Sequence, residues 1–335
     1  MNEYLYAWEG IACIAVMMIH CMLPGGLGPL MQAAARFGVP LFFAVSGKYL
    51  LLQWETGTGD REALRGILKK RIRRTFFTIL FVVALHTLYS LIWHIARAES
   101  LSVWLRTKYA PAEWLRLIIF NTGGVISDGS VLFDHLWYLF ALLYVFILFY
   151  FTGDCLIRRA RFLVLPLLIC YYLGLHYRNR IHLSIGPFST DDWYILRNWF
   201  LPGLLFVLLG AWLAHVNLGR KGLLLALMGF PVMLLEYMRY GTRDCYLGSL
   251  FTVIGALTGS VPRIPSLLVS LGRNCSRHVY YWHMMVYSLL IWVFWILPGD
   301  WHARPVTGWL LPLGTYGISI LFAALLSRPR PDARL

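Results

Sequence analysis

The feature that most constrains this chain is a series of long apolar runs that continues along nearly its whole length. Hydrophobic residues make up 59% of its 335 residues and charged residues only 14%, whereas a soluble domain has about 25% charged residues. A helix of roughly 17 to 25 apolar residues crosses a bilayer. The sequence therefore predicts an all-α, polytopic bundle of transmembrane helices embedded in a lipid bilayer.

We expect about ten spans within a single domain that covers residues 1–335. The apolar runs that predict them are 4–23, 37–53, 75–95, 135–152, 162–176, 197–216, 223–239, 247–261, 278–297 and 308–327. Lys and Arg concentrate on one side, where 18 of the 30 lie in segments 54–74, 153–161, 217–222, 262–277 and 328–335. By the positive-inside rule this side is cytoplasmic, so both termini are expected inside.

Charge and cysteine content exclude several other classes of protein. The net charge of +14 comes from basic residues clustered between apolar runs, which argues against binding to nucleic acid. The six cysteines are scattered without a C-x-x-C pair, so we expect neither a disulfide framework nor a metal site. The first apolar run has no basic segment before it and no small-residue cleavage site after it, and is predicted to be a retained helix.

Two connections are longer than simple loops. Residues 97–134 contain an amphipathic stretch, which is expected to lie in the membrane interface or to re-enter the bilayer. Residues 177–196 form a polar external loop with Asp191, Asp192 and Trp193. We find no internal repeat, and hence no sign of inverted-repeat transporter architecture.

Ionisable residues inside a bilayer are costly, which makes each of them a functional candidate. Glu9 and His20 share one face of the first span, because eleven residues make about three turns and about 16 Å of helix. At neutral pH the His20 imidazole can accept the proton of a sugar hydroxyl, as acyl transfer requires. The alternative is an interfacial histidine that is bonded to a loop.

The second span contains Ser46-Gly47-Lys48. Ser46 and Gly47 are small enough to let another helix approach closely. Lys48 and Glu9 each lie about five residues from the cytoplasmic end of their spans, which predicts an ion pair between antiparallel neighbours. In the alternative, each side chain reaches the headgroups independently.

Three further groups are candidates for binding. Arg71 and Arg74 share a face if this segment is helical, and their guanidinium groups suit the phosphates of cytoplasmic coenzyme A. Ordinary topogenic charge explains the same arginines. His135 with Trp137, at the outer rim, and Tyr280 with His283, about one turn inside the cytoplasmic rim, are either substrate contacts or members of aromatic belts.

Taken together, these segments resemble the acyltransferase 3 family of membrane acyltransferases. The matching residues run in the family's order: Gly10 to His20, Val39-Pro40-Leu41-Phe42-Phe43 with Ser46-Gly47, Arg71-x-x-Arg74, His135-Leu136-Trp137, Leu271-Gly272-Arg273 and Tyr280-x-x-His283. The chain looks most like the single-domain O-acetyltransferases that modify enterobacterial common antigen and related surface polysaccharides.

The resemblance implies a bacterial inner-membrane enzyme that uses an acyl-CoA donor, with acetyl-CoA expected, and a saccharide or lipid-linked saccharide acceptor. It implies that His20 is the catalytic histidine, that Arg71 and Arg74 hold the donor, and that Ser46 belongs to the same motif set. One departure is evident. The family has Arg, or sometimes Lys, at the position of Glu9, and usually an aromatic residue at that of Lys48.

This departure leaves two interpretations open: a charge swap between Glu9 and Lys48, or an altered site. The function hypothesis is therefore O-acyl transfer to a cell-envelope hydroxyl, with His20 as general base. The alternatives are a transporter or flippase for a lipid-linked saccharide, and a non-catalytic accessory subunit.

Overall fold

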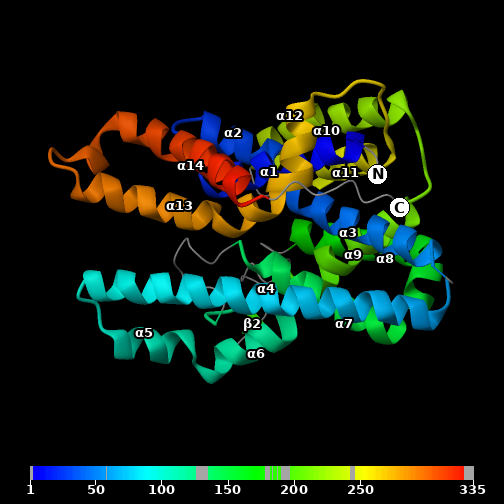
Figure 1. The fold of residues 1–335 in the computed structure, drawn as a ribbon, viewed down its shortest axis with the longest axis horizontal. Coiled ribbons are helices and arrows are strands. Elements are labelled where there is room, and N and C mark those ends of the chain that lie inside the picture. Colours follow the sequence, from blue (N-terminus) through cyan, green and yellow to red (C-terminus); the bar gives the residue numbers. More distant parts are fainter. Residues whose placement is uncertain are drawn as a thin grey trace. The chain divides into compact units, whose positions relative to one another are not determined.

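The computed structural model describes residues 3–57, 59–125, 135–177, 182, 184–186, 188–189, 197–241 and 246–327. Its ribbon is helical almost throughout (Figure 1). The chain forms two compact units, which are described separately below. Unit 1 comprises Met1–Phe42 and His215–Leu335, and unit 2 comprises Phe43–Ala214.

Unit 1 is built from helices of both ends of the sequence. Its elements are α1 (Glu3–His20), α2 (Leu27–Ala34), the first turn of α3 (Gly38–Glu55), α10 (Arg220–Tyr240), α11 (Tyr246–Thr258), α12 (Ser266–Ser270), the π-helical segment η3 (Leu271–Cys275), α13 (Ser276–Ile296), the 3-10 turn η4 (Trp301–Ala303) and α14 (Pro305–Leu326). Helices α13 and α14 form an antiparallel hairpin (Figure 1).

Glycines allow the closest helix contacts in unit 1. A Cβ at Gly222 would collide with the backbone of Gly259, and one at Gly248 with the backbone of Gly229, so α10 and α11 pack with their backbones in contact. Small residues at helix crossings are typical of membrane bundles, because lipid provides no hydrophobic force to drive helices together.

Unit 2 contains the rest of α3 and the middle of the chain. Its elements are α4 (Arg61–Ala96), α5 (Leu101–Lys108), α6 (Pro111–Phe120), α7 (Trp137–Arg158), α8 (Ala160–Tyr177), the two-residue strands β1 (Ser184–Ile185) and β2 (Phe188–Ser189), the π-helical segment η2 (Trp199–Leu204) and α9 (Leu205–Trp212). The two strands pair antiparallel.

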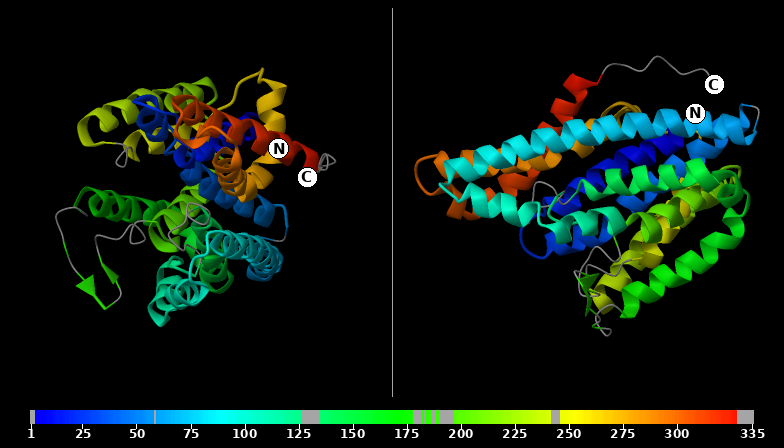
Figure 2. Two further views of the ribbon diagram at one scale, coloured as in Figure 1. Left: turned by 90° about the vertical axis from the view of Figure 1, so that its left-hand side faces the viewer. Right: turned by 90° about the horizontal axis from the view of Figure 1, so that it is seen from below.

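Helix α4 is one unbroken helix of 36 residues (Figure 2). It begins at a capped residue, since the Asp60 carboxylate accepts a hydrogen bond of 2.7 Å from the Ala63 amide. One side of the helix exposes large apolar residues, as expected of a surface that faces lipid: Phe76, Phe77, Leu80, Phe81, Leu88, Ile92 and Ile95. The opposite side is a buried stripe at helical spacing: Leu64, Leu68, Ile79, Val82, His86 and Ser90.

The C-terminal end of α6 is held by the buried side chain of Asn121. Its amide donates to the Trp137 carbonyl at the start of α7 (3.1 Å), and its carbonyl oxygen accepts from the Trp199 amide at the start of η2 (2.6 Å). Asn121 has a φ of 51°, a left-handed conformation that asparagine tolerates. One residue therefore joins three elements of unit 2.

The structure confirms the all-α, polytopic membrane fold. Within the described residues, seven helical segments are long and apolar enough to cross a bilayer, among them α4, α7, α8, α10 and α14. The segment of η2 with α9, and α11, are shorter apolar helices. Each expected span coincides with one or more of the described helices. The count of ten spans, the orientation and the single-domain boundary stay predictions. Asp191, Asp192 and Trp193 lie outside the described residues.

Candidate active site

The candidate base, His20, is the last residue of α1, and its side chain is partly exposed. Two side chains from other helices satisfy the carbonyl groups on either side of it. Gln32 Nε2 donates to the Ile19 carbonyl at 2.9 Å, and the Tyr316 hydroxyl donates to the Cys21 carbonyl. Carbonyls at a helix C-terminus have no partner within their own helix, so these contacts fix the position of His20.

His283 lies beside His20, with the two ring centroids 5.6 Å apart and the rings tilted by 48°. His283 has no exposed surface. Its Nδ1 lies 2.9 Å from the Val279 carbonyl and 3.1 Å from the Tyr280 carbonyl, one turn earlier in α13. Tyr280 is also buried, and its ring centroid lies 6.5 Å from that of His283.

The sequence predicts that His283 lies about one turn inside the cytoplasmic rim, and this depth stays a prediction; the structure shows that its ring lies beside that of His20. The helix that carries His283 does not begin at residue 278, because α12, η3 and α13 form one continuous run, Ser266–Ile296. His283 is thus seventeen residues from the start of the run.

Two glycines bring α1 and η3 together. A Cβ at Gly272 would overlap the Tyr6 carbonyl, and one at Gly10 would meet the Leu268 carbonyl and the Gly272 amide. The Arg273 guanidinium lies over the Tyr6 ring, 4.8 Å from its centroid. The Leu271-Gly272-Arg273 motif therefore forms the crossing point of these two helices.

Glu9 is buried, with 8% of its surface exposed. It belongs to unit 1 and Lys48 belongs to unit 2. The predicted ion pair between them therefore stays a prediction. Lys48 and Ser46 are both half-buried on α3.

In unit 2, Arg71 is directed toward α3. Its guanidinium donates to the Ser46 carbonyl at 3.2 Å and to Gln53 Oε1 at 3.1 Å, and lies 5.7 Å from the centroid of the Phe146 ring. Arg71 continues the buried stripe of α4, three residues after Leu68. The main-chain carbonyl of Ser46, in the Ser46-Gly47 motif, thus accepts a hydrogen bond from Arg71 of the Arg71-x-x-Arg74 motif.

Gly47 has a separate packing role. A Cβ there would overlap the Val207 carbonyl on α9, and reciprocally a Cβ at Gly210 would overlap the Ala44 carbonyl. The backbones of α3 and α9 cross in contact. The Ser46-Gly47 pair therefore contacts two helices, α4 through Ser46 and α9 through Gly47.

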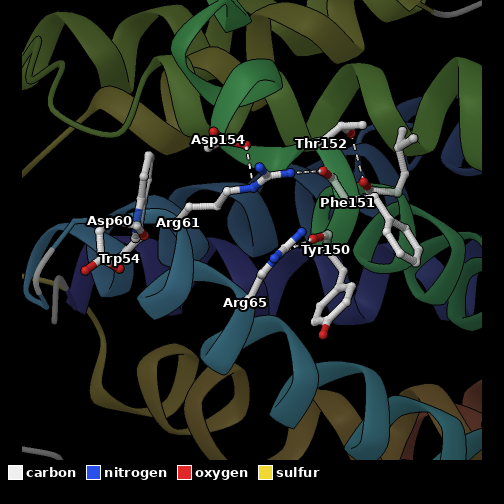
Figure 3. Close-up of polar contacts among 9 residues, drawn as sticks. Trp54, Asp60, Arg61, Arg65, Tyr150, Phe151, Thr152 and Asp154 are labelled. Carbon is white, nitrogen blue, oxygen red and sulfur yellow. Dashed lines mark hydrogen bonds and ion pairs between the residues drawn. The ribbon is translucent and has the colours of Figure 1, made fainter.

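The remaining basic residues of α4 fall into two sets. Arg61 donates to the Phe151 carbonyl at 3.1 Å and lies 3.8 Å from Asp154, and Arg65 donates to the Tyr150 carbonyl at 3.3 Å (Figure 3). These two side chains tie α4 to α7. The other set is exposed and, within the described part of the chain, has no hydrogen-bond or ion-pair partner: Lys69, Lys70, Arg73 and Arg74.

His135 is buried and lies beside His86 of α4, with ring centroids 5.6 Å apart. His86 Nδ1 lies 2.9 Å from the Val82 carbonyl. Trp137 is half-buried, and its ring lies 5.9 Å from that of Phe43. Sequence reasoning missed His86, although an ionisable residue within an apolar run was a sufficient signal.

Two histidine pairs therefore share one geometry, one pair in each unit. In each, one ring is bonded through Nδ1 to the carbonyl four residues earlier, and the second ring lies 5.6 Å away at a helix end. Across the described residues, no three His, Cys, Asp or Glu side chains gather as metal ligands do. Imidazole is a side chain that can gain or lose a proton near neutral pH.

Comparison with protein families gives the class of the protein. A family model described as an acyltransferase domain matches residues 2–328. The chain belongs to the acyltransferase 3 family. No curated protein and no solved structure matches the sequence significantly. The protein is thus a multi-pass membrane acyltransferase, and its donor and acceptor are considered next.

Proposed function

We propose that this membrane acyltransferase transfers an acyl group, with acetyl as the first candidate, from cytoplasmic acyl-CoA to a hydroxyl of a cell-envelope saccharide at the bacterial inner membrane. The observation that supports it best is the partly exposed His20, held at the end of α1 in a chain of this family. An imidazole is the side chain best suited to take a proton from a hydroxyl near pH 7.

The proposed reaction is a direct transfer. His20 takes the proton of the acceptor hydroxyl while the oxygen attacks the thioester carbonyl. The C–S bond then breaks, and the coenzyme A thiolate leaves and receives the proton from the His20 imidazolium. Atoms and charge balance without an added oxidant or metal. A route through an acyl-His20 intermediate gives the same products in two steps.

The remaining candidates have binding roles in this proposal. Arg71 and Arg74 hold the donor phosphates, together with Ser46 and Lys48 on α3. The acceptor contacts are His135, Trp137 and Tyr280. Arg74 supports the donor role best because it is exposed, whereas Arg71 already bonds to α3.

A transfer assay with the purified protein tests the proposal. The detergent-solubilised enzyme is incubated with acetyl-CoA labelled in the acetyl group, with and without a lipid-linked envelope saccharide. We expect thiol release that depends on acceptor and label that becomes base-labile on the saccharide. Saccharide transport without coenzyme A dependence would instead support a transporter, and no turnover together with intact donor binding would support an accessory subunit.

Replacing Arg74 with Ala is expected to raise the KM for acetyl-CoA by about tenfold or more, because a charge-assisted hydrogen bond contributes about 1.5–3 kcal/mol. Thermal stability should not change, since Arg74 is exposed. Arg71→Ala should raise the same KM and also lower stability, because it removes the contacts with Ser46 and Gln53. Arg73→Ala is the matched control. An equal rise in KM for this variant would mean that Arg74 contributes only to the general positive charge of this surface.

Glu9→Arg distinguishes a charge swap from an altered site. If Glu9 and Lys48 form a pair, Glu9→Arg abolishes transfer, and adding Lys48→Glu restores it. If the site is disabled, Glu9→Arg alone raises activity above that of the natural protein. The measurement is acceptor-dependent thiol release by the two single variants and the double variant. If all three variants have the activity of the natural protein, Glu9 has no role in the reaction.

A further inference from the structure

We propose that His283 is a positioning residue for His20: it accepts a hydrogen bond from one ring nitrogen of His20 and so leaves the other nitrogen as the base. This inference rests on the proposed function, in which His20 deprotonates the acceptor. It takes the place of a direct substrate contact of His283, because the His283 ring lies beside that of His20.

The tautomer of His283 follows from its own helix. Its Nδ1 faces two carbonyl oxygens, at 2.9 Å and 3.1 Å. Carbonyl oxygens only accept hydrogen bonds, so Nδ1 carries the hydrogen. In the neutral ring the lone pair then lies on Nε2. His283 can therefore act toward a neighbouring ring only as an acceptor.

The neighbouring ring is that of His20. The ring centroids lie 5.6 Å apart, close to the separation of two imidazoles joined by an N–H···N hydrogen bond. Catalytic hydrogen bonds are often long before substrate binds and shorten in the complex. Once this N–H is donated to His283, the second nitrogen of His20 carries the lone pair that receives the proton of the hydroxyl.

The exposure of the two rings supports this division of roles. His20 is partly exposed and can meet a substrate, whereas His283 is fully buried and lies beside His20. A base whose tautomer is fixed by a buried third group is the arrangement of hydrolytic triads. Here a neutral imidazole would replace the buried carboxylate.

The surrounding contacts hold the two rings in place. Gln32 and Tyr316 anchor the end of α1, and the Gly10–Gly272 crossing sets the spacing between α1 and the His283 helix. The unit thus fixes both the position and the tautomer of its base.

Two substitutions of His283 test the inference. His283→Phe keeps a ring but removes the acceptor, and should lower kcat on the order of 10²-fold with little change in either KM. His283→Gln keeps an acceptor in its side-chain carbonyl and should recover at least part of that loss. The same change on the same helix, His278→Phe, is the control and should retain natural activity. Equal losses for Phe and Gln would overturn the positioning role.

A double-variant cycle separates an effect of His283 that acts through His20 from an effect on folding. In a His20→Ala background, His283→Phe should cause no further loss, because the residue acts only through His20. A further loss of similar size would contradict the inference. If His283→Phe does not fold, as judged by its melting temperature, His283→Met takes its place. If transfer requires His20 but is unchanged by substitution of His283, this inference alone is wrong. If the natural protein shows no transfer, the proposed function is wrong.

Discussion

Replacing His20 with Gln is expected to lower kcat for acyl transfer by about 10²–10⁴-fold, the range for loss of a general base. Glutamine matches much of the volume of histidine but cannot take a proton at neutral pH. Donor binding should persist, because the proposed phosphate contacts are Arg71 and Arg74. The measurement is acceptor-dependent thiol release, combined with acetyl-CoA binding to the same preparation.

The control for His20→Gln is His176→Gln, which makes the same change at an exposed position of α8. It should leave turnover unchanged. An acyl-His20 intermediate would be detected as label retained on the natural protein when acceptor is omitted. A His20→Gln enzyme with natural turnover would remove His20 from the chemistry and with it the proposed mechanism.

Replacing Gly272 with Ala is expected to destabilise the protein and to abolish most activity. The added Cβ would overlap the Tyr6 carbonyl and lie 2.8 Å from the Gly10 amide nitrogen. Both obstacles are backbone atoms, so the helices must separate. Overpacking of this kind costs about 1–3 kcal/mol or more. Because α1 carries His20, the same separation changes its approach to His283.

The measurement for Gly272→Ala is the melting temperature in detergent together with turnover. Gly317→Ala on α14 is the matched control, because no heavy atom lies within 4 Å of its added Cβ. That variant should be neutral or more stable by up to about 1 kcal/mol, since alanine favours helix more than glycine does. If Gly272→Ala is as stable and active as Gly317→Ala, the crossing does not position the site.

Short motifs along the chain predict which residues belong to the site, but not which groups each side chain contacts. Arg71 shows the difference. Its spacing from Arg74 suggested a shared phosphate site, whereas in the structure Arg71 bonds to Ser46 and Gln53 on α3 and Arg74 is exposed. The partners of a long side chain depend on the helix opposite, which spacing within one helix does not specify.

Helix boundaries show the same limit. The basic run ending at Arg74 was expected to be part of a loop, and residues 262–277 were expected to precede a span. Both contain helix, since α4 begins at Arg61 and a continuous helical run begins at Ser266. Charged residues end a hydrophobic span but do not end a helix, because the backbone hydrogen bonds continue in water as well as in lipid.

The sequence by itself determined the class of fold, the approximate place of each apolar helix, the family and the candidate base. These follow from local properties, namely apolar length, charge and the order of short motifs, all of which are written along the chain. The tertiary structure decided which groups meet: His20 with His283, His86 with His135, and Arg71 with Ser46. Such meetings depend on how far each helix extends and where glycines let two backbones cross, and those are properties of pairs of helices rather than of any one segment.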